Sequence, residues 1–309
     1  MFGILNIYKP VGLTSHDVVG ILRKILKIKQ VGHAGTLDPF AQGVLPVCVG
    51  KATRLIEYLD DDKEYLATVK FGSATETYDV EGKVTKTSDK NVSAEEVVEG
   101  LKSFEGKISQ VPPIYSAIKV NGKKLYEYAR NNEEVKIEPR TVFIEKIELK
   151  EFDKTAQVAQ ISIKCSKGTY IRSIANNLGE NLGCFAHLIR LERTVVGKFL
   201  AKNSIELPVK LTEPPQSGKA PKFEILEGAE EFLTKNILNP ADILSTQKIL
   251  INEKGLERIS NGNPLKISAQ IICEKKLNAE DFVILVYNNE VKAVGQVDGL
   301  EIKIRKVFV

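Results

Sequence analysis

Apolar residues recur along the chain with two different periods, which predict helices in some segments and strands in others. Between Thr14 and Lys29 the spacing is that of one face of a helix. The apolar residues on this face are Val18, Ile21, Leu22, Ile25 and Leu26. Thr14 and Asp17 fit a capping box, so the helix is expected to begin next to this threonine. Further helices are predicted over residues 93–104, 171–183, 227–236 and 240–244.

Strict alternation predicts strands elsewhere. In KEYLATVKFG (63–72) one face of a strand would carry four side chains, Tyr65, Ala67, Val69 and Phe71. Other strands are predicted over 142–152 and 157–166, and in FVILVY, VKAVGQV and LEIKIRKVFV of the tail. Helices and strands are mixed without a regular βαβ order, so we expect an α+β fold with a mixed or largely antiparallel sheet.

A change in composition divides the chain. Residues 207–222, LPVKLTEPPQSGKAPK, concentrate proline with lysine and polar residues, which predicts a loop or linker. The 309 residues suit one large domain followed by a small one. We expect one large domain over 1–240, of a size typical of a catalytic domain, and a small β-rich module over 246–309.

The composition is that of a water-soluble globular protein, with 43% hydrophobic and 27% charged residues. No apolar run reaches the roughly 18–20 residues needed to cross a bilayer, and the first residues lack the features of a signal peptide. Four scattered cysteines without a C-x-x-C pair favour a reduced, cytoplasmic protein. A net charge of +4 is weak evidence for nucleic-acid binding.

The segment VGHAGTLDPFAQGV (31–44) is unusual for a core segment, because it holds three glycines and a single carboxylate. Pro39 disfavours the helical conformation at Asp38 and so favours an extended one. The glycines allow close backbone approach or positive φ. Such a loop can present its carboxylate to a ligand, and carboxylates can attack sugar or base carbons directly. These local facts alone still favour Asp38 as the cap of the following turn.

Two other interpretations of this region fail. A phosphate-binding P-loop around Gly50-Lys51 would need glycine at 45 and serine or threonine at 52, where the chain has Leu45 and Ala52. A metal site would need more donors than His33 and Asp38, and the other histidines offer no paired spacing. We therefore expect neither a metal nor a cofactor.

At this point a family resemblance emerges. GHAGTLDPFAQGVLPVCVGKATR resembles the aspartate motif of the TruB family of tRNA pseudouridine synthases. NIYKPVGLTSHDVV is similar to the family's N-terminal motif, and KEYLATVKFGSATETYDVEG to its tyrosine-bearing strand. QVPPIYSAIKVNGKKLYEYAR resembles an insertion that clamps RNA, KGTYIRSIANNLG the arginine motif and GCFAHLIRLERTVVGKF the leucine motif. The motifs stand in the family's order up to about residue 200, and the tail is similar to a PUA module.

The resemblance implies an activity and a set of roles. It implies conversion of uridine to pseudouridine at position 55 in the T loop of tRNA, on a flipped-out base and without a cofactor. Asp38 would be the nucleophile, Tyr65 would stack on the base and handle protons, and Arg172 would pair with the catalytic carboxylate. His33, Tyr170 and Leu191 would surround the flipped nucleotides.

Physical chemistry supports these roles. An arginine keeps a neighbouring carboxylate ionised, and a tyrosine offers both a stacking face and a hydroxyl. Without the family, each residue has an ordinary explanation: Tyr65 as strand packing, Arg172 as a surface charge and Leu191 as core. The family leaves only Leu191 leaning towards a structural role. Glu192 departs from the family, because many members carry a basic residue there.

The insertion, about 112–140, mixes cations with tyrosines. Lys119, Lys123, Lys124 and Arg130 could contact phosphates while the tyrosines stack on unpaired bases. Composition alone favours a solvated basic loop, so the RNA-binding role comes from the resemblance.

We expect a monomeric, cytoplasmic enzyme that binds the T stem-loop of tRNA without a guide RNA and without a membrane. Two alternatives remain: an RNA chaperone that folds tRNA without catalysis, and the guide-RNA-dependent relative of archaea and eukaryotes. The presence of Asp38, Tyr65 and Arg172 favours catalysis over a chaperone. The short N-terminus and the lack of a basic tail favour the stand-alone type.

Overall fold

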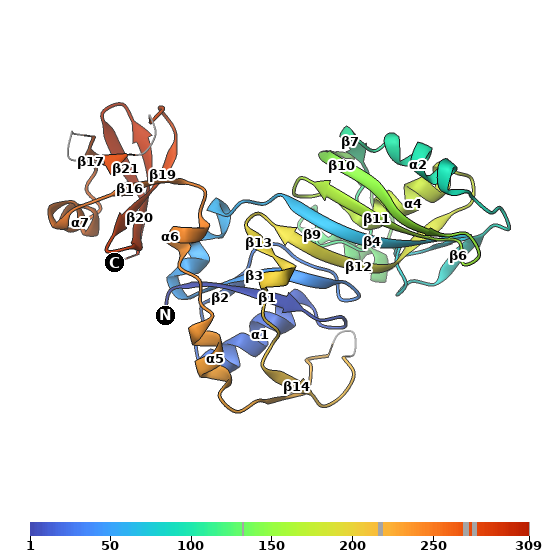
Figure 1. Cartoon of the computed structure of the whole chain (residues 1–309), viewed down its shortest axis with the longest axis horizontal. Helices are drawn as coiled ribbons and strands as arrows, with labels where there is room; N and C mark the ends of the chain where they lie inside the picture. The colour runs from blue at the N-terminus through green and yellow to red at the C-terminus, as the bar shows by residue number, and fades with distance from the viewer. Residues whose placement is uncertain (132, 216–218, 268–271, 274–276, 309) are drawn as a thin grey trace.

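The computed structural model describes residues 1–131, 133–215, 219–267, 272–273 and 277–308. Its largest element is a nine-stranded sheet with the order β1-β3-β12-β4-β11-β10-β7, in which β2 also pairs with β3 and β13 with β12 (Figure 1). The strands are β1 (Gly3–Lys9), β2 (Val31–His33), β3 (Gln42–Val49), β4 (Lys63–Phe71), β7 (Gly106–Gln110), β10 (Arg140–Asp153), β11 (Val158–Cys165), β12 (Ala186–Val196) and β13 (Phe199–Leu200). Neighbours are antiparallel except β3 and β12, which run parallel. The predicted α+β fold with a mixed sheet is confirmed.

Strand β4 shows the predicted alternation. Tyr65, Ala67, Val69 and Phe71 are buried, and the residues between them are partly exposed. The buried face packs into one apolar cluster with residues of α2 (Ala94–Lys102) and α4 (Ile171–Asn181). Figure 1 shows both helices at the end of the sheet that holds β10 and β11. Two predicted helices therefore cover one face of the predicted strand.

Helix α1 (Ser15–Leu26) begins where the sequence predicts. Thr14 accepts a hydrogen bond from the Asp17 amide, and the Asp17 carboxylate accepts one from the Thr14 amide, which completes the capping box. The apolar face of the helix packs against β1 and β3 in a second cluster. That cluster also includes residues of α5 (Ala229–Lys235).

The segment 207–222 is not only a loop. It contains β14 (Val209–Leu211), which pairs with β15 (Phe223–Ile225). Leu207 is buried in the cluster around α1, and Val209, Leu211 and Phe223 of the hairpin pack against the same cluster. The proline-rich composition does not predict this strand, because packing against the cluster stabilises it rather than local propensity. The part over 216–218 lies outside the described residues.

A second sheet follows α6 (Pro240–Ile243), with the order β17-β21-β20-β19-β16-β18. Its strands are β16 (Gln247–Leu250), β17 (Leu265–Lys266), β18 (Ile272–Cys273), β19 (Phe282–Tyr287), β20 (Glu290–Asp298) and β21 (Glu301–Val307), with α7 (Glu253–Ser260) beside them. The three strands predicted in the tail correspond to β19, β20 and β21, and position 309 of the last lies outside the described residues. Figure 1 shows this sheet at one end of the molecule.

The second sheet shares a core with the first part of the chain. Ile284, Val286 and Phe308 belong to the same buried cluster as Ala52 and Leu55 of the 3₁₀ segment η1 (Gly50–Tyr58). Polar contacts surround this apolar junction. Arg54 donates from Nη1 to the Val307 carbonyl at 3.1 Å, and Lys306 donates to the Arg54 carbonyl and pairs with Glu57. The small sheet is therefore packed against η1 and does not hang from a free linker.

The remaining elements are short. They are β5 (Ser73–Thr75), β6 (Val84–Thr87), β8 (Lys119–Val120), β9 (Lys123–Lys124), α3 (Leu125–Arg130) and the 3₁₀ turn η2 (Ala201–Asn203). None of the helices in the described part of the chain combines the length and the apolar character that a membrane crossing requires.

One glycine makes the contact between β3 and β12 possible. Gly43 has a φ of +114°, and a Cβ atom placed there would lie 2.3 Å from the Arg193 carbonyl oxygen. Gly106 also has a positive φ, +81°, but a Cβ atom there would meet nothing within 4 Å. A side chain at position 106 would therefore cause backbone strain alone, whereas a side chain at position 43 would cause both backbone strain and a steric clash.

We predict that Gly106→Ala lowers the free energy of unfolding by about 1–2 kcal/mol, the cost of a left-handed conformation. Gly43→Ala should lower it by a further 1–3 kcal/mol or more, about the cost of overpacking, because β3 and β12 must move apart. Urea titrations of both variants measure the difference. Equal losses would mean that the close approach of the strands contributes nothing.

Candidate active site

Asp38 lies on the loop 34–41 between β2 and β3, and its side chain is 31% exposed. The backbone of this loop is fixed by a buried serine. Ser15 Oγ accepts from the Leu37 amide at 2.9 Å and donates to the Leu37 carbonyl at 3.2 Å. The Ala41 amide donates to the Asp38 carbonyl, which closes a turn. The backbone of Asp38 makes the turn, so its carboxylate remains available for other partners.

The carboxylate is held by Arg172, in the first turn of α4. Arg172 Nε lies 3.0 Å from Asp38 Oδ2, and Nη2 donates to Oδ1 at 3.3 Å. This fork of two bonds fixes the orientation of the carboxylate as well as its charge. The arginine side chain is only 6% exposed, so it is not a surface charge.

Arg172 also binds three groups that the sequence analysis did not identify. Its Nη1 donates to the Thr77 carbonyl at 3.1 Å and lies 3.4 Å from Asp79 Oδ2, and its Nη2 donates to the Tyr115 carbonyl at 3.0 Å. Asp79 is buried, and this burial raises the pKa of its carboxyl group. Thr77 Oγ1 donates to Asp79 Oδ1 at 2.6 Å. The arginine is thus shared by one accessible and one buried carboxylate.

Tyr65 is buried on β4, in the same apolar cluster as Leu37, Phe40 and Leu191. Burial raises the pKa of the Tyr65 hydroxyl to about 12, and the nearby Arg193 opposes this shift. The tyrosine is therefore neutral at physiological pH, with its proton available as a hydrogen-bond donor. Leu191 from β12 and Tyr65 from β4 are brought together by the pairing of these strands.

Arg193 was not identified from the sequence, although it stands two residues after Leu191. Its side chain is fully buried, and its guanidinium donates to three backbone carbonyls, those of Val44 at 2.8 Å, Thr36 at 3.0 Å and Gly35 at 3.1 Å. The only signal in the sequence was a charged residue at an alternating, inward position of a strand.

Lys9 is a second buried cation beneath the loop. Its Nζ donates to the carbonyls of Leu13 at 2.6 Å, Pro10 at 2.8 Å and Pro39 at 3.3 Å. Burial lowers the pKa of Lys9 to about 7, and the charge of Asp38 opposes this shift. The lysine joins the N-terminal motif to the residue that follows Asp38.

The other expected substrate contacts lie at the edges of this site. Tyr170 precedes α4, and its backbone amide and carbonyl are both bonded by the Gln110 side chain, at 2.8 Å and 3.1 Å. His33 lies edge-on to His16, with ring centroids 5.5 Å apart, and burial lowers its pKa. No direct contact joins His33 to Asp38 among the interactions of the described residues.

Glu192, where the chain departs from the family, accepts a hydrogen bond from the Tyr8 hydroxyl at 2.9 Å. Burial, together with this carboxylate, raises the pKa of Tyr8 to about 12. Glu192 therefore binds Tyr8, and its negative charge cannot make the phosphate contact expected of a basic residue at this position.

The four cations of the insertion lie on the β8–β9 hairpin and α3, and none of them has an ion pair with Asp38 among the described residues. Lys119 is exposed, whereas Lys123 pairs with Glu133 at 2.7 Å. Lys124 and Arg130 both lie over the ring of Tyr126. These contacts occupy three of the four cations within the insertion itself.

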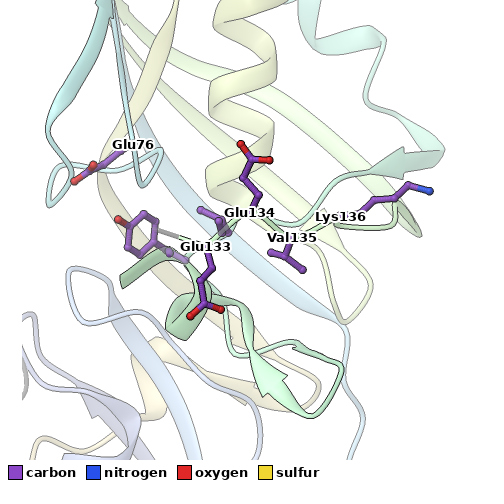
Figure 2. Close-up of a pocket in the computed structure, with 8 residues that line it drawn as sticks. Glu76, Glu133, Glu134, Val135 and Lys136 are labelled. Carbon is purple, nitrogen blue, oxygen red and sulfur yellow. The ribbon is translucent and has the colours of Figure 1, made fainter. Parts of the chain in front are cut away.

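An open hollow of about 800 Å³ lies between the insertion and the turn after β5. Tyr115 contributes to its wall, and Figure 2 shows Glu76, Glu133 and Glu134 around it with Lys136 at one side. Three carboxylates make this hollow unsuited to a phosphate. No group of three histidine, cysteine or acidic side chains that could hold a metal occurs in the described ranges of the chain.

Comparisons with known proteins find a family model and several named relatives that match this chain. Residues 23–171 match the family described as TruB family pseudouridylate synthase (N terminal domain). The chain is 51% identical over 208 residues to tRNA pseudouridine synthase B of Clostridium novyi (strain NT), a match that covers 67% of this chain and 71% of that protein. It is 41% identical over 297 residues to tRNA pseudouridine synthase B of Clostridium acetobutylicum, which covers 96% of this chain and 94% of the relative.

A solved structure titled as a Cbf5-Nop10-Gar1 complex contains a chain of the same fold. Its TM-score is 0.72 at 27% identity, and the match covers 100% of this chain and 85% of that chain. The likeness supports the same arrangement of sheet and helices over the full length.

The burial of Lys9 predicts a dependence of stability on pH. Its pKa is about 7 in the folded protein and about 10.4 in an unfolded chain. Between these values the unfolded chain binds more protons, so folding stability rises with pH. The cost of burying the charge is present in full below pH 7 and is lost as the pH approaches 10.

We predict that the free energy of unfolding rises by about 2 kcal/mol more from pH 7 to pH 9 in the wild type than in Lys9→Met. The variant is expected to be less stable at both values, because three carbonyls lose their donor. Urea unfolding at the two pH values measures this difference. Lys29→Met, at an exposed lysine, is the control and should follow the wild type. Parallel pH dependences for wild type and Lys9→Met would contradict a lowered pKa.

Proposed function

Because the chain belongs to the TruB family of pseudouridylate synthases, we propose that it converts uridine to pseudouridine at position 55 in the T loop of tRNA. The names of its relatives, two of which match 96% and 100% of this chain, support tRNA as the substrate. In this reaction the bond between the uracil nitrogen and the ribose breaks, a carbon–carbon bond forms, and a carbon-bound proton is lost while the nitrogen gains one. The balance requires no oxidant, reductant or second substrate.

One observation supports the reaction above all others: Asp38 is paired with a buried arginine and is still partly exposed. A nucleophile has to be ionised, oriented and accessible at the same time. An RNA chaperone has no need of such a carboxylate, since binding a negatively charged backbone favours cations. We assign Asp38 as the nucleophile and Arg172 as the residue that pairs with its carboxylate and orients it.

Tyr65 and Leu191 are proposed to receive the uracil. The target uridine lies in a folded loop, so it has to leave the base stack before Asp38 can reach it. An aromatic ring and an aliphatic side chain replace the stacking that the base loses. The neutral Tyr65 hydroxyl is suited to proton handling on the base. His33 and Tyr170 are proposed to contact the flipped nucleotides at the edge of this site.

The insertion is proposed to clamp the RNA through Lys119, Lys123, Lys124 and Arg130. Lys119 is exposed and ready for a phosphate, while Lys123 would exchange its partner Glu133 for one. Charge-assisted contacts to phosphates are stronger than exposed ion pairs between side chains, which favours this exchange.

The second sheet is proposed to be a PUA-like RNA-binding module over 246–309, beside a catalytic domain over 1–240. Lys303 and Arg305 are exposed on β21, where Lys303 pairs with Asp298 and Arg305 donates to Gln296 Oε1, and both would exchange these partners for a phosphate. Lys306 is assigned to the junction instead, because its side chain is only 19% exposed and binds Glu57 and the Arg54 carbonyl. We propose a cytoplasmic monomer that needs no guide RNA, because its curated relatives are named as tRNA enzymes over nearly their full length.

The proposal is tested with purified protein and an unmodified tRNA transcript, with no other factor present. Pseudouridine should form at position 55, and Asp38→Asn should reduce its formation by about 10⁴-fold or more, the loss expected for a covalent nucleophile. Binding of tRNA should change by less than about tenfold, or 1.4 kcal/mol. Sequencing of the modified position and filter binding measure the two quantities.

Two outcomes would contradict this assignment. If Asp38→Asn lost tRNA binding and thermal stability together, the carboxylate would be structural. If it kept more than a few per cent of activity, after deamidation to aspartate had been excluded by mass spectrometry, another residue would be the nucleophile. Pseudouridine formed only on addition of a guide RNA would favour the guide-dependent alternative.

A second prediction concerns the small sheet. The double variant Lys303→Gln/Arg305→Gln should weaken tRNA binding, and the slope of log affinity against log salt should fall by about 0.9 per lost phosphate contact. The rate on saturating tRNA should remain unchanged, because both residues are remote from Asp38. Lys102→Gln/Lys150→Gln on α2 and β10 removes two other exposed lysines and serves as the control. Equal slopes in the two double variants would leave the small sheet without an RNA-binding role.

A further inference from the structure

Arg193 poses a physical problem. It is the largest fully buried side chain described, and no carboxylate lies within ion-pair distance of its guanidinium among the described residues. Burying a cation without an anion is costly, and an apolar residue of similar volume would fill the space at a lower cost in stability. The charge therefore needs an explanation other than packing.

Its three bonds show what the charge does. Gly35 and Thr36, which stand just before Asp38, accept from Nη2 and Nη1, and Val44, on the far side of the loop, accepts from Nε. The planar guanidinium thus spans both stems of the loop that carries the carboxylate. A fork of fixed geometry restrains the spacing of these stems in a way that a flexible ammonium cannot.

Arg193 is also the strand neighbour of the other central residue. It stands opposite Tyr65 in the β4–β12 ladder, and its positive charge opposes the rise that burial causes in the pKa of the Tyr65 hydroxyl. Arg193 therefore binds the loop of Asp38 and lies beside Tyr65 in the sheet. Its own position is set by the strand pairing and by the close approach of Gly43 to its backbone.

We propose that Arg193 is a positioning residue that fixes the backbone of the Asp38 loop relative to the Tyr65 hydroxyl. Arg172 holds the carboxylate itself, and Arg193 holds the chain that carries it, so the two arginines have separate tasks. This inference rests on the proposed function, because Asp38 and Tyr65 need a fixed separation only if both act on one uridine. Small displacements of reacting groups reduce rates by about 10²-fold.

The test compares Arg193→Lys with the wild type. Lysine keeps the charge but loses the planar fork, so the single-turnover rate on saturating tRNA should fall by about 10- to 100-fold. The dissociation constant for tRNA should stay within about threefold, because Arg193 is buried away from the RNA. Hydrogen exchange of the amides in residues 34–41 should become faster, while exchange in β10 and β11 stays unchanged.

Leu101→Ala is the matched control. Leu101 is a buried core residue of α2, a helix that packs mainly against β10 and α4, and its truncation lowers stability by about 2–5 kcal/mol. It should leave the single-turnover rate and the loop exchange near wild type. If Arg193→Lys kept the wild-type rate, or if Leu101→Ala lost as much rate, Arg193 would be merely structural.

A double variant tests the link to Tyr65. If Arg193 acts partly through the Tyr65 hydroxyl, Arg193→Lys should reduce the rate less in a Tyr65→Phe background than in the wild type. If Arg193→Lys reduced the rate by the same factor in both backgrounds, this part of the proposal would be overturned. A wild-type protein that forms no pseudouridine would refute the proposed function instead. In that case hydrogen exchange would still decide whether Arg193 holds the loop.

Discussion

Burying positive charge beneath a single loop is the constraint on which this structure depends. Lys9, Arg172 and Arg193 are all nearly or fully removed from water, and their donors are satisfied by backbone carbonyls and by Asp38 and Asp79. Each carbonyl has to be brought within hydrogen-bond distance, because an unpaired buried cation is strongly unfavourable. The positions of the loop, of α4 and of β12 follow from this requirement.

The strand order makes these contacts possible. Strand β12 is distant in sequence from β3 and β4 and yet lies between them, in parallel with β3 and antiparallel to β4. The position of β12 between β3 and β4 places Arg193 beside Gly43 on one side and Tyr65 on the other. A residue with a side chain at position 43 would push the strands apart, so the glycine is as necessary to the site as the charged residues.

The charges around Asp38 suit the chemistry proposed for it. The carboxylate is partly exposed and is held by a buried guanidinium, so it is oriented and still accessible. The cations that we propose for RNA binding lie elsewhere, on the insertion and on the second sheet. Because the second sheet shares an apolar core with η1, its surface is held in place relative to the site.

The sequence by itself determined the local elements and the residues with a distinctive motif. Periodicity and capping placed α1 and β4, and the motifs identified Asp38, Tyr65 and Arg172, because these signals lie within a few neighbouring residues. Only the tertiary structure decided what Lys9, Asp79 and Arg193 contact and that part of 207–222 forms a strand. Their partners are mostly backbone carbonyls or distant apolar faces, which have no residue-type signature and acquire a position only when the strands pair.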